Sequence, residues 1–195
     1  MTFADSVAMI TVNTARRRRA QGEVPEECII MRIVFSLLMD NTPGVLSRIA
    51  GLFTRRGYNI ESITAGVTAD PRFTRMTVVS TGDHDVLEQI EKQIRKLEDV
   101  RDIKRLYDKN SVFRELVMIK IRATAQQREA VNAVATIFRA SIVDVSKDSM
   151  TIMMTGDQDK VDALINLLAD YEILELARTG LTGLSRGSDD VRYFD

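Results

Sequence analysis

The chain has 195 residues, 45% hydrophobic and 28% charged, a composition typical of a soluble globular protein with one or two domains. Its 27 Lys and Arg residues nearly cancel its 28 Asp and Glu residues, so no overall field attracts nucleic acid or an anionic membrane. The only cysteine, Cys28, has no intrachain disulfide partner, which fits a reducing compartment. No apolar run approaches the roughly 20 residues of a membrane-spanning helix. We therefore expect a cytoplasmic protein with no membrane or nucleic-acid partner.

Residues 1–27 stand apart from the rest of the chain as an N-terminal extension. Four arginines, Arg16 to Arg19, follow a weakly apolar stretch, which is the reverse of the order in a secretory signal. The Ser, Thr and Arg content is shared with organelle transit peptides, and a solvated arm or an interface helix would have it too. The sequence leaves these alternatives open.

Between residues 28 and 109 the apolar pattern predicts the order strand, helix, strand, strand, helix, strand. The run CIIMRIVFSLLM is continuous and rich in Ile, as in a strand buried on both faces. We expect Gly57 to end the first helix and Pro71 to lie in the hairpin between the middle strands. The apolar faces of the two helices consist of Val45, Ile49, Leu52 and Phe53, and of Leu87, Ile90, Ile94 and Leu97.

The same order recurs in residues 110–195. RMTVVSTGDHDVLEQIEKQI matches SMTIMMTGDQDKVDALINLL, and Gly82 and Gly156 are 74 residues apart (156 − 82). Phe53 pairs with Phe138, so we expect the first unit to be 11 residues longer between its first helix and its third strand (138 − 53 − 74). An internal repeat of this kind predicts an α+β fold of two ferredoxin-like βαββαβ units in tandem. Each unit would place two helices on one face of a four-stranded antiparallel sheet.

The segment DNTPGVLSRIAGLFTRRGYNI joins the first strand to the first helix. Pro43 suits the first position of a helix, and Asn41 or Thr42 can cap the same end. Gly44 has no side chain, so another molecule can approach the N–H groups of Gly44, Val45 and Leu46. A carboxylate suits such a site, and the Asn41 amide can bind a second charged end of a free amino acid. The second unit has ATAQQREAV here, so we expect only the first unit to bind.

These residues carry a resemblance to a known family. The stretch DNTPGVLSRIAGLFTRRGYNIESI resembles the ligand-binding segment of ACT domains, and specifically of the regulatory small subunit of acetolactate synthase, also called acetohydroxyacid synthase. The similarity runs from Met31 to Gly187 and includes FTRMTV, VLEQIEKQIRKLEDV and ARTGLTGLSRG. The first unit is accordingly identified as an ACT domain.

The resemblance implies a regulatory role in the biosynthesis of valine, leucine and isoleucine. A small subunit of this family activates a separate catalytic large subunit and confers feedback inhibition by valine. It carries no cofactor itself, and thiamine diphosphate, magnesium and FAD are expected on the large subunit. ACT domains pair side by side, so the implied valine site combines two chains of a homodimer. It comprises Asn41, Gly44, Val45 and Leu46 of one chain with Asn59 and Ile60 of the other.

No catalytic arrangement emerges from the sequence. The motif GDHD at Gly82 has no following Gly, and its counterpart GDQD in the repeat favours a helix cap. His84 is the only histidine, so no Cys/His nucleophile or zinc cluster can be argued. Tandem ferredoxin-like units also bind RNA, but the third strands lack the aromatic and basic residues of such modules. The nearer alternative is an amino-acid sensor that regulates a different enzyme.

Overall fold

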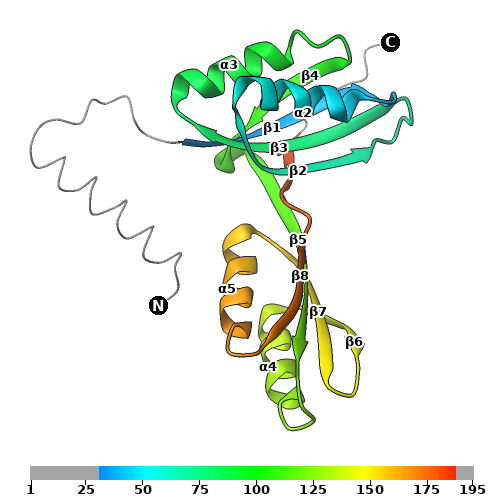
Figure 1. The fold of residues 1–195 in the computed structure, drawn as a ribbon, viewed down its shortest axis with the longest axis vertical. Helices are drawn as coiled ribbons and strands as arrows, with labels where there is room; N and C mark the ends of the chain where they lie inside the picture. The colour runs from blue at the N-terminus through cyan, green and yellow to red at the C-terminus, as the bar shows by residue number, and fades with distance from the viewer. Residues whose placement is uncertain (1–30, 188–195) are drawn as a thin grey trace, which may run out of the picture.

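The computed structural model describes residues 31–187, which form two α+β units joined end to end (Figure 1). The first unit consists of β1 (Met31–Asp40), α2 (Val45–Arg56), β2 (Asn59–Val67), β3 (Phe73–Gly82), α3 (His84–Ile94) and β4 (Val100–Leu106). A single 3₁₀ turn, η1 (Asp108–Asn110), leads into the second unit. That unit consists of β5 (Ser111–Arg122), α4 (Arg128–Phe138), β6 (Ser141–Val145), β7 (Ser149–Gly156), α5 (Gln158–Leu168), β8 (Ile173–Arg178) and β9 (Thr182–Ser185). The predictions for residues 1–27 and for Cys28 lie outside the described residues.

Both sheets are antiparallel, and the predicted fold class is confirmed. The strand order is β2-β3-β1-β4 in the first sheet and β6-β7-β5-β8 in the second. In each unit the two helices cover one face of the sheet (Figure 1). The first core contains the predicted helix positions, of which Leu97 is only partly buried. A separate core of Val, Ile, Leu and Met side chains fills the second unit.

The helix ends show how the two units correspond. Asp83 caps α3 and Asp157 caps α5, each by accepting a hydrogen bond from a backbone N–H three residues later, so the predicted spacing of 74 residues is confirmed here. The first helices end at Gly57 and Arg139, both in the left-handed conformation. Those caps are 82 residues apart (139 − 57).

The predicted equivalence of Phe53 and Phe138 is therefore wrong by three residues. By the cap spacing, the counterpart of Phe53 is Ala135, and both are buried in their cores. Ala140 donates to the carbonyl of Ala135 as Tyr58 does to that of Phe53. The first unit is thus longer by 8 residues (82 − 74) rather than 11. The backbone bonds at a helix end decide the equivalence, whereas a shared aromatic residue type does not.

The end of the described chain returns to the first unit. β9 pairs with residues 111–114 at the start of β5, and Leu181 is buried with Val34, Val79 and Leu106. The Thr64 hydroxyl donates to the carbonyl of Leu181 at 2.9 Å. Residues 180–185, called the return segment, therefore cover part of the face of the first sheet that carries no helices. No helix within residues 31–187 is long and apolar enough to cross a membrane.

Candidate functional site

The connection from β1 to α2 is a tight turn that ends in a left-handed glycine. Gly44 has φ 90° and ψ −9°, values close to the third residue of a type II turn, in which proline favours the second position. The Val45 N–H reaches the Thr42 carbonyl at 3.4 Å, which closes this turn. Pro43 therefore belongs to the turn. The expectation from the sequence, that Pro43 is the first helical residue, is wrong. The helix begins at Val45 with Gly44 as its N-cap.

The turn leaves several backbone donors accessible. No backbone hydrogen bond among the described residues uses the N–H of Gly44, Leu46 or Ser47, whereas the N–H of Val45 closes the turn. Gly44 and Leu46 are exposed, Leu46 by 53%. The Val45 side chain, in contrast, is buried in the core. The free donors together with the positive end of α2 form an anion site. Ser47 was missed by sequence reasoning.

Asn41 does not cap the helix, and neither does Thr42, because the start of α2 has no side-chain cap. Asn41 Nδ2 donates to the Pro71 carbonyl at 2.9 Å, and its Oδ1 accepts from the Thr74 hydroxyl at 3.1 Å. The side chain thus ties the turn to the β2–β3 hairpin. Its amide is already engaged at both ends, so Asn41 positions the turn.

Arg48 lies over the same turn, which sequence reasoning did not predict. A Cβ atom built on Gly44 would lie 3.9 Å from Arg48 Nη2, and Arg48 Nη1 pairs with Asp99 at 3.0 Å. Helical side chains lean toward the N-terminus of their helix, so an arginine four residues after a glycine turn is a signal that could have been used. The guanidinium adds positive charge beside the free N–H groups.

Asn59 and Ile60 lie far from this turn within one chain. Asp40 pairs with Phe73 on β3, and Asn59 pairs with Thr81, eight residues farther along the strand. At about 3.4 Å per residue the two ends of the sheet are about 27 Å apart. The structure therefore brings Asn41, Gly44, Val45 and Leu46 together and leaves Asn59 and Ile60 at the other end. One chain by itself does not form the implied site.

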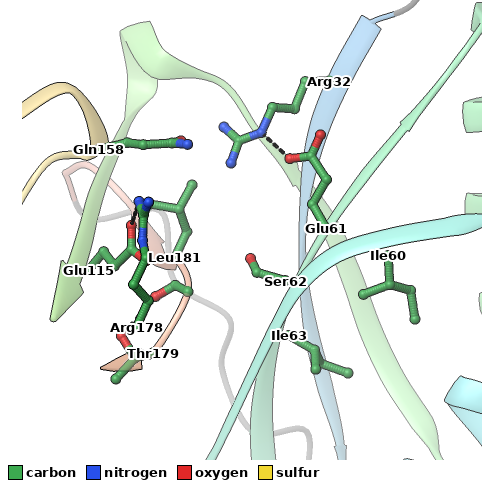
Figure 2. Close-up of a pocket in the computed structure, with 11 residues that line it drawn as sticks. Arg32, Ile60, Glu61, Ser62, Ile63, Glu115, Gln158, Arg178, Thr179 and Leu181 are labelled. Carbon is green, nitrogen blue, oxygen red and sulfur yellow. Dashed lines mark hydrogen bonds and ion pairs between the residues drawn. The ribbon is translucent and has the colours of Figure 1, made fainter. Parts of the chain in front are cut away.

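A second concave site lies between the two units (Figure 2). This interunit cleft has a volume of about 600 Å³. One wall comes from the first unit and the other from the second. The lining residues used below are Arg32, Glu61, Ser62, Glu115, Gln158, Arg178 and Gly180.

The wall from the second unit contains a strongly held ion pair. Arg178 binds both carboxylate oxygens of Glu115 at 2.8 and 2.7 Å, and its third nitrogen binds Asp162 at 2.8 Å. The Glu115 side chain is only 4% exposed. Hydrogen bonds from the Arg178 guanidinium lower the pKa of Glu115, and the same bonds raise the pKa of Arg178. Both groups stay charged at neutral pH.

Two family models match the chain. Residues 35–102 match the AHAS small subunit-like ACT domain, and residues 114–187 match the small subunit of acetolactate synthase. A probable acetolactate synthase small subunit of Methanothermobacter thermautotrophicus is 49% identical over 80% of this chain and 93% of its own length. The chain belongs to the acetolactate synthase small subunit family.

Further relatives agree with this assignment. The small subunit of acetolactate synthase isozyme 3 from Salmonella typhimurium is 46% identical over 83% of this chain and all of its own. The crystal structure of the acetolactate synthase small subunit from Thermotoga maritima matches with a TM-score of 0.76 and 38% identity, over 81% of this chain and 99% of that one. The resemblance inferred from the sequence is therefore confirmed.

In this member of the small subunit family the second unit lacks the turn. By the helix-end spacing, Gln126 and Ala130 replace Gly44 and Arg48. The N-cap of α4 is Gln127, with φ −82°, so this helix does not begin after a left-handed residue. Gln127 Oε1 accepts from both the N–H and the hydroxyl of Thr124, at 2.9 and 3.0 Å. The loop is therefore closed by its own side chain and has no glycine, and the guanidinium of Arg128 at the helix start is bound to the carbonyls of Ser146 and Lys147.

A possible metal-binding group occurs at the start of α3. Ligand atoms of His84, Asp85 and Glu88 lie within 4.8 Å of one another. The His84 side chain is 72% exposed, and the Asp85 side chain is 90% exposed. Glu88 is held by Lys92 at 2.7 Å. Exposed groups that already have a cationic partner do not make a built metal site in this small subunit.

Proposed function

We propose that the chain is a regulatory subunit of acetolactate synthase that activates the catalytic large subunit and confers feedback inhibition by valine. Family membership supports the assignment to a small subunit. The single observation that carries the sensing role is the left-handed Gly44 turn, whose N–H groups stay accessible at the start of α2. The absence of such a turn from the equivalent place in the second unit argues against a purely structural explanation.

The chemistry of the turn suits the carboxylate of a free amino acid. The N–H groups of Gly44, Leu46 and Ser47 would donate to the carboxylate, and the Arg48 guanidinium would add a charge-assisted contact. The exposed Leu46 side chain offers an apolar surface to the valine methyl groups. Asn41 and Val45 would hold the turn in place. Asn41 fixes it to the β2–β3 hairpin, and Val45 fixes it to the core.

The rest of the site would come from a second chain. β2 is at the edge of the first sheet among the described residues, and unpaired edges of this kind are normally covered. If two chains pair β2 with β2 about a two-fold axis, the strands run antiparallel. Asn59 and Ile60 of one chain then approach the hairpin end of the other, to which Asn41 ties the turn. The homodimer thus assembles the two halves that one chain keeps apart.

The catalytic reaction of the complex would take place on the large subunit. We assign thiamine diphosphate, magnesium and FAD to the large subunit and no cofactor to this chain. The second unit, which lacks the turn, would contact the large subunit or transmit its regulation. Truncation after Asn110 would be a poor test, because it removes Leu181 and so uncovers Val34, Val79 and Leu106.

The proposal is tested by reconstitution with an acetolactate synthase large subunit. We expect the two chains to co-purify, the activity of the large subunit to rise, and valine to inhibit only the reconstituted complex. Light scattering at micromolar concentration should give at least a dimer. A stable complex without valine sensitivity would contradict the sensing role. If there is neither a complex nor activation while free amino acids bind the isolated chain, the alternative of a sensor for another enzyme would be favoured.

A further inference from the structure

We propose that the interunit cleft is a second ligand site, which binds a free amino acid as a zwitterion. Within one chain it is separate from the Gly44 turn, although Ile60, which would complete the valine site of a second chain, also lines it. The turn lies at the start of α2, whereas the cleft lies at the other end of the first sheet, where the start of β2 faces the segment between β8 and β9. Figure 2 shows its two walls facing each other across an open space.

Three polar groups of the cleft have unused hydrogen-bonding capacity. Arg32 is bound to Glu61 through Nε alone, at 2.6 Å, and its terminal nitrogens point across the gap toward Gln158 (Figure 2). The side-chain amide of Gln158 has no partner among the described residues. The Ser62 hydroxyl oxygen is buried and also has no partner among them. The Ser62 oxygen lies behind the wall of the cleft, out of reach of a ligand. The donors of Arg32 and Gln158 are the groups that converge on the open space, and a ligand there would use these two.

The charges of the cleft define the ligand. Among the residues that line the cleft, the two guanidinium groups of Arg32 and Arg178 are balanced by the two carboxylates of Glu61 and Glu115. A phosphate or a dicarboxylate would add net negative charge to a region whose own charges already cancel, so neither is favoured. A zwitterion adds no net charge. Its carboxylate would bind the Arg32 fork and the Gln158 amide, and its ammonium would bind the Glu61 carboxylate.

The back of the cleft is closed by a tight backbone contact. Gly180 has φ 81°, and a Cβ atom there would lie only 2.7 Å from the Ser62 Cβ and 3.0 Å from its hydroxyl oxygen. Glycine therefore lets β2 and the return segment approach closely. A volume of about 600 Å³ is ample for an amino acid and falls in the usual range of small-molecule pockets. A ligand that contacts both Arg32 and Gln158 would link the two units.

The test measures binding of each of the twenty free amino acids to the full-length chain, by calorimetry and by ligand-observed NMR. We expect at least one amino acid to bind at the cleft, and we expect Arg32→Ala to weaken its affinity about tenfold. This is the effect of losing a charge-assisted bidentate contact. Gln158→Glu should weaken it similarly, because a carboxylate then faces the ligand's own. That variant should stay folded, since an acidic residue suits the first turn of α5.

Arg122→Ala is the matched control. Arg122 also binds a single glutamate through Nε at 2.6 Å, but it lies outside the cleft. It should leave every affinity unchanged. Gly44→Asp should remove any class bound at the turn and keep the cleft class, which separates the two proposals. If Arg32→Ala and Gln158→Glu bind all twenty amino acids as the unmodified chain does, or if no amino acid binds at millimolar concentration, the cleft is not an amino-acid site.

Discussion

Asn41 and Asn59 lie at opposite ends of one sheet, about 27 Å apart along β3. Each is fixed locally, Asn41 by Pro71 and Thr74, and Asn59 by a bond to the Thr81 hydroxyl at 3.2 Å. No movement within one chain brings them together without breaking the sheet. A valine site that uses both residues therefore requires two chains.

Mixed dimers provide the sharpest test of this arrangement. Gly44→Asp disables the turn and Asn59→Ala disables the opposite half, so each homodimer should bind no valine. When the two variants are unfolded and refolded together, half of the dimers are mixed, and each mixed dimer has one intact site. About one site in four should then bind valine. Calorimetric titration gives the stoichiometry, and the separately refolded variants are the control. No recovery on mixing would contradict the shared site.

Gly44 should matter for binding more than for stability. Any side chain there meets the left-handed conformation, which costs about 1 to 2 kcal/mol. Gly57→Ala is the matched control, since Gly57 is also left-handed, at the other end of α2. We expect both Gly44→Asp and Gly57→Ala to lower the free energy of unfolding by that amount in urea titrations. Only Gly44→Asp should abolish valine binding. Equal loss of binding in the two variants would mean that the effect comes from instability of the helix.

Arg48 is expected to strengthen the turn as an anion site. Arg48→Ala should weaken valine binding about tenfold, because one charge-assisted contact is lost, while the free energy of unfolding changes by less than about 1 kcal/mol, as for exposed ion pairs. Arg48→Lys should restore binding only in part, since a lysine lacks the planar fork. Calorimetry at two salt concentrations checks the claim. A valine affinity that does not change in Arg48→Ala would place the guanidinium outside the site.

The Glu115–Arg178 pair should make stability depend on acid pH. Hydrogen bonds from Arg178 lower the pKa of Glu115 below its ordinary value of 4.5, so the folded state binds a proton less readily than the unfolded state. The contribution of the ionised Glu115 to the free energy of unfolding is complete above about pH 4.5 and is lost as the pH falls through the lowered pKa. Glu115→Gln should cost about 2 kcal/mol of unfolding free energy at pH 7.

The same variant should also have a flatter loss of stability below pH 4.5. Urea titrations between pH 3 and pH 7 measure both effects, and Glu172→Gln, which alters an exposed pair with Arg122, is the control. A Glu115→Gln profile parallel to that of the unmodified chain would contradict the assignment.

Local patterns were enough to predict most of the elements. The apolar face of α2, with Val45, Ile49, Leu52 and Phe53, is buried as expected, because helix periodicity is a property of neighbouring residues. Gly57 ends α2 as predicted, and the Asp caps of α3 and α5 keep the spacing of the repeat. The equivalence of Phe53 and Phe138 failed, because a residue type says nothing about its position relative to a helix end.

The sequence by itself determined the fold class, the tandem repeat, the family and the restriction of the Gly44 turn to the first unit. These properties depend on residue order over short windows. Only the tertiary structure decided that Pro43 and Gly44 form a turn before the helix, and that Arg48 lies over it. It also showed that Asn59 is at the far end of the sheet and that Arg32 faces Gln158 across a cleft. The turn and Arg48 are local, and the spacing of the glycine and the arginine could have indicated them. The positions of Asn59 and Arg32 depend on strand pairing and on the return of the chain, which join residues distant in sequence, and no local pattern records them.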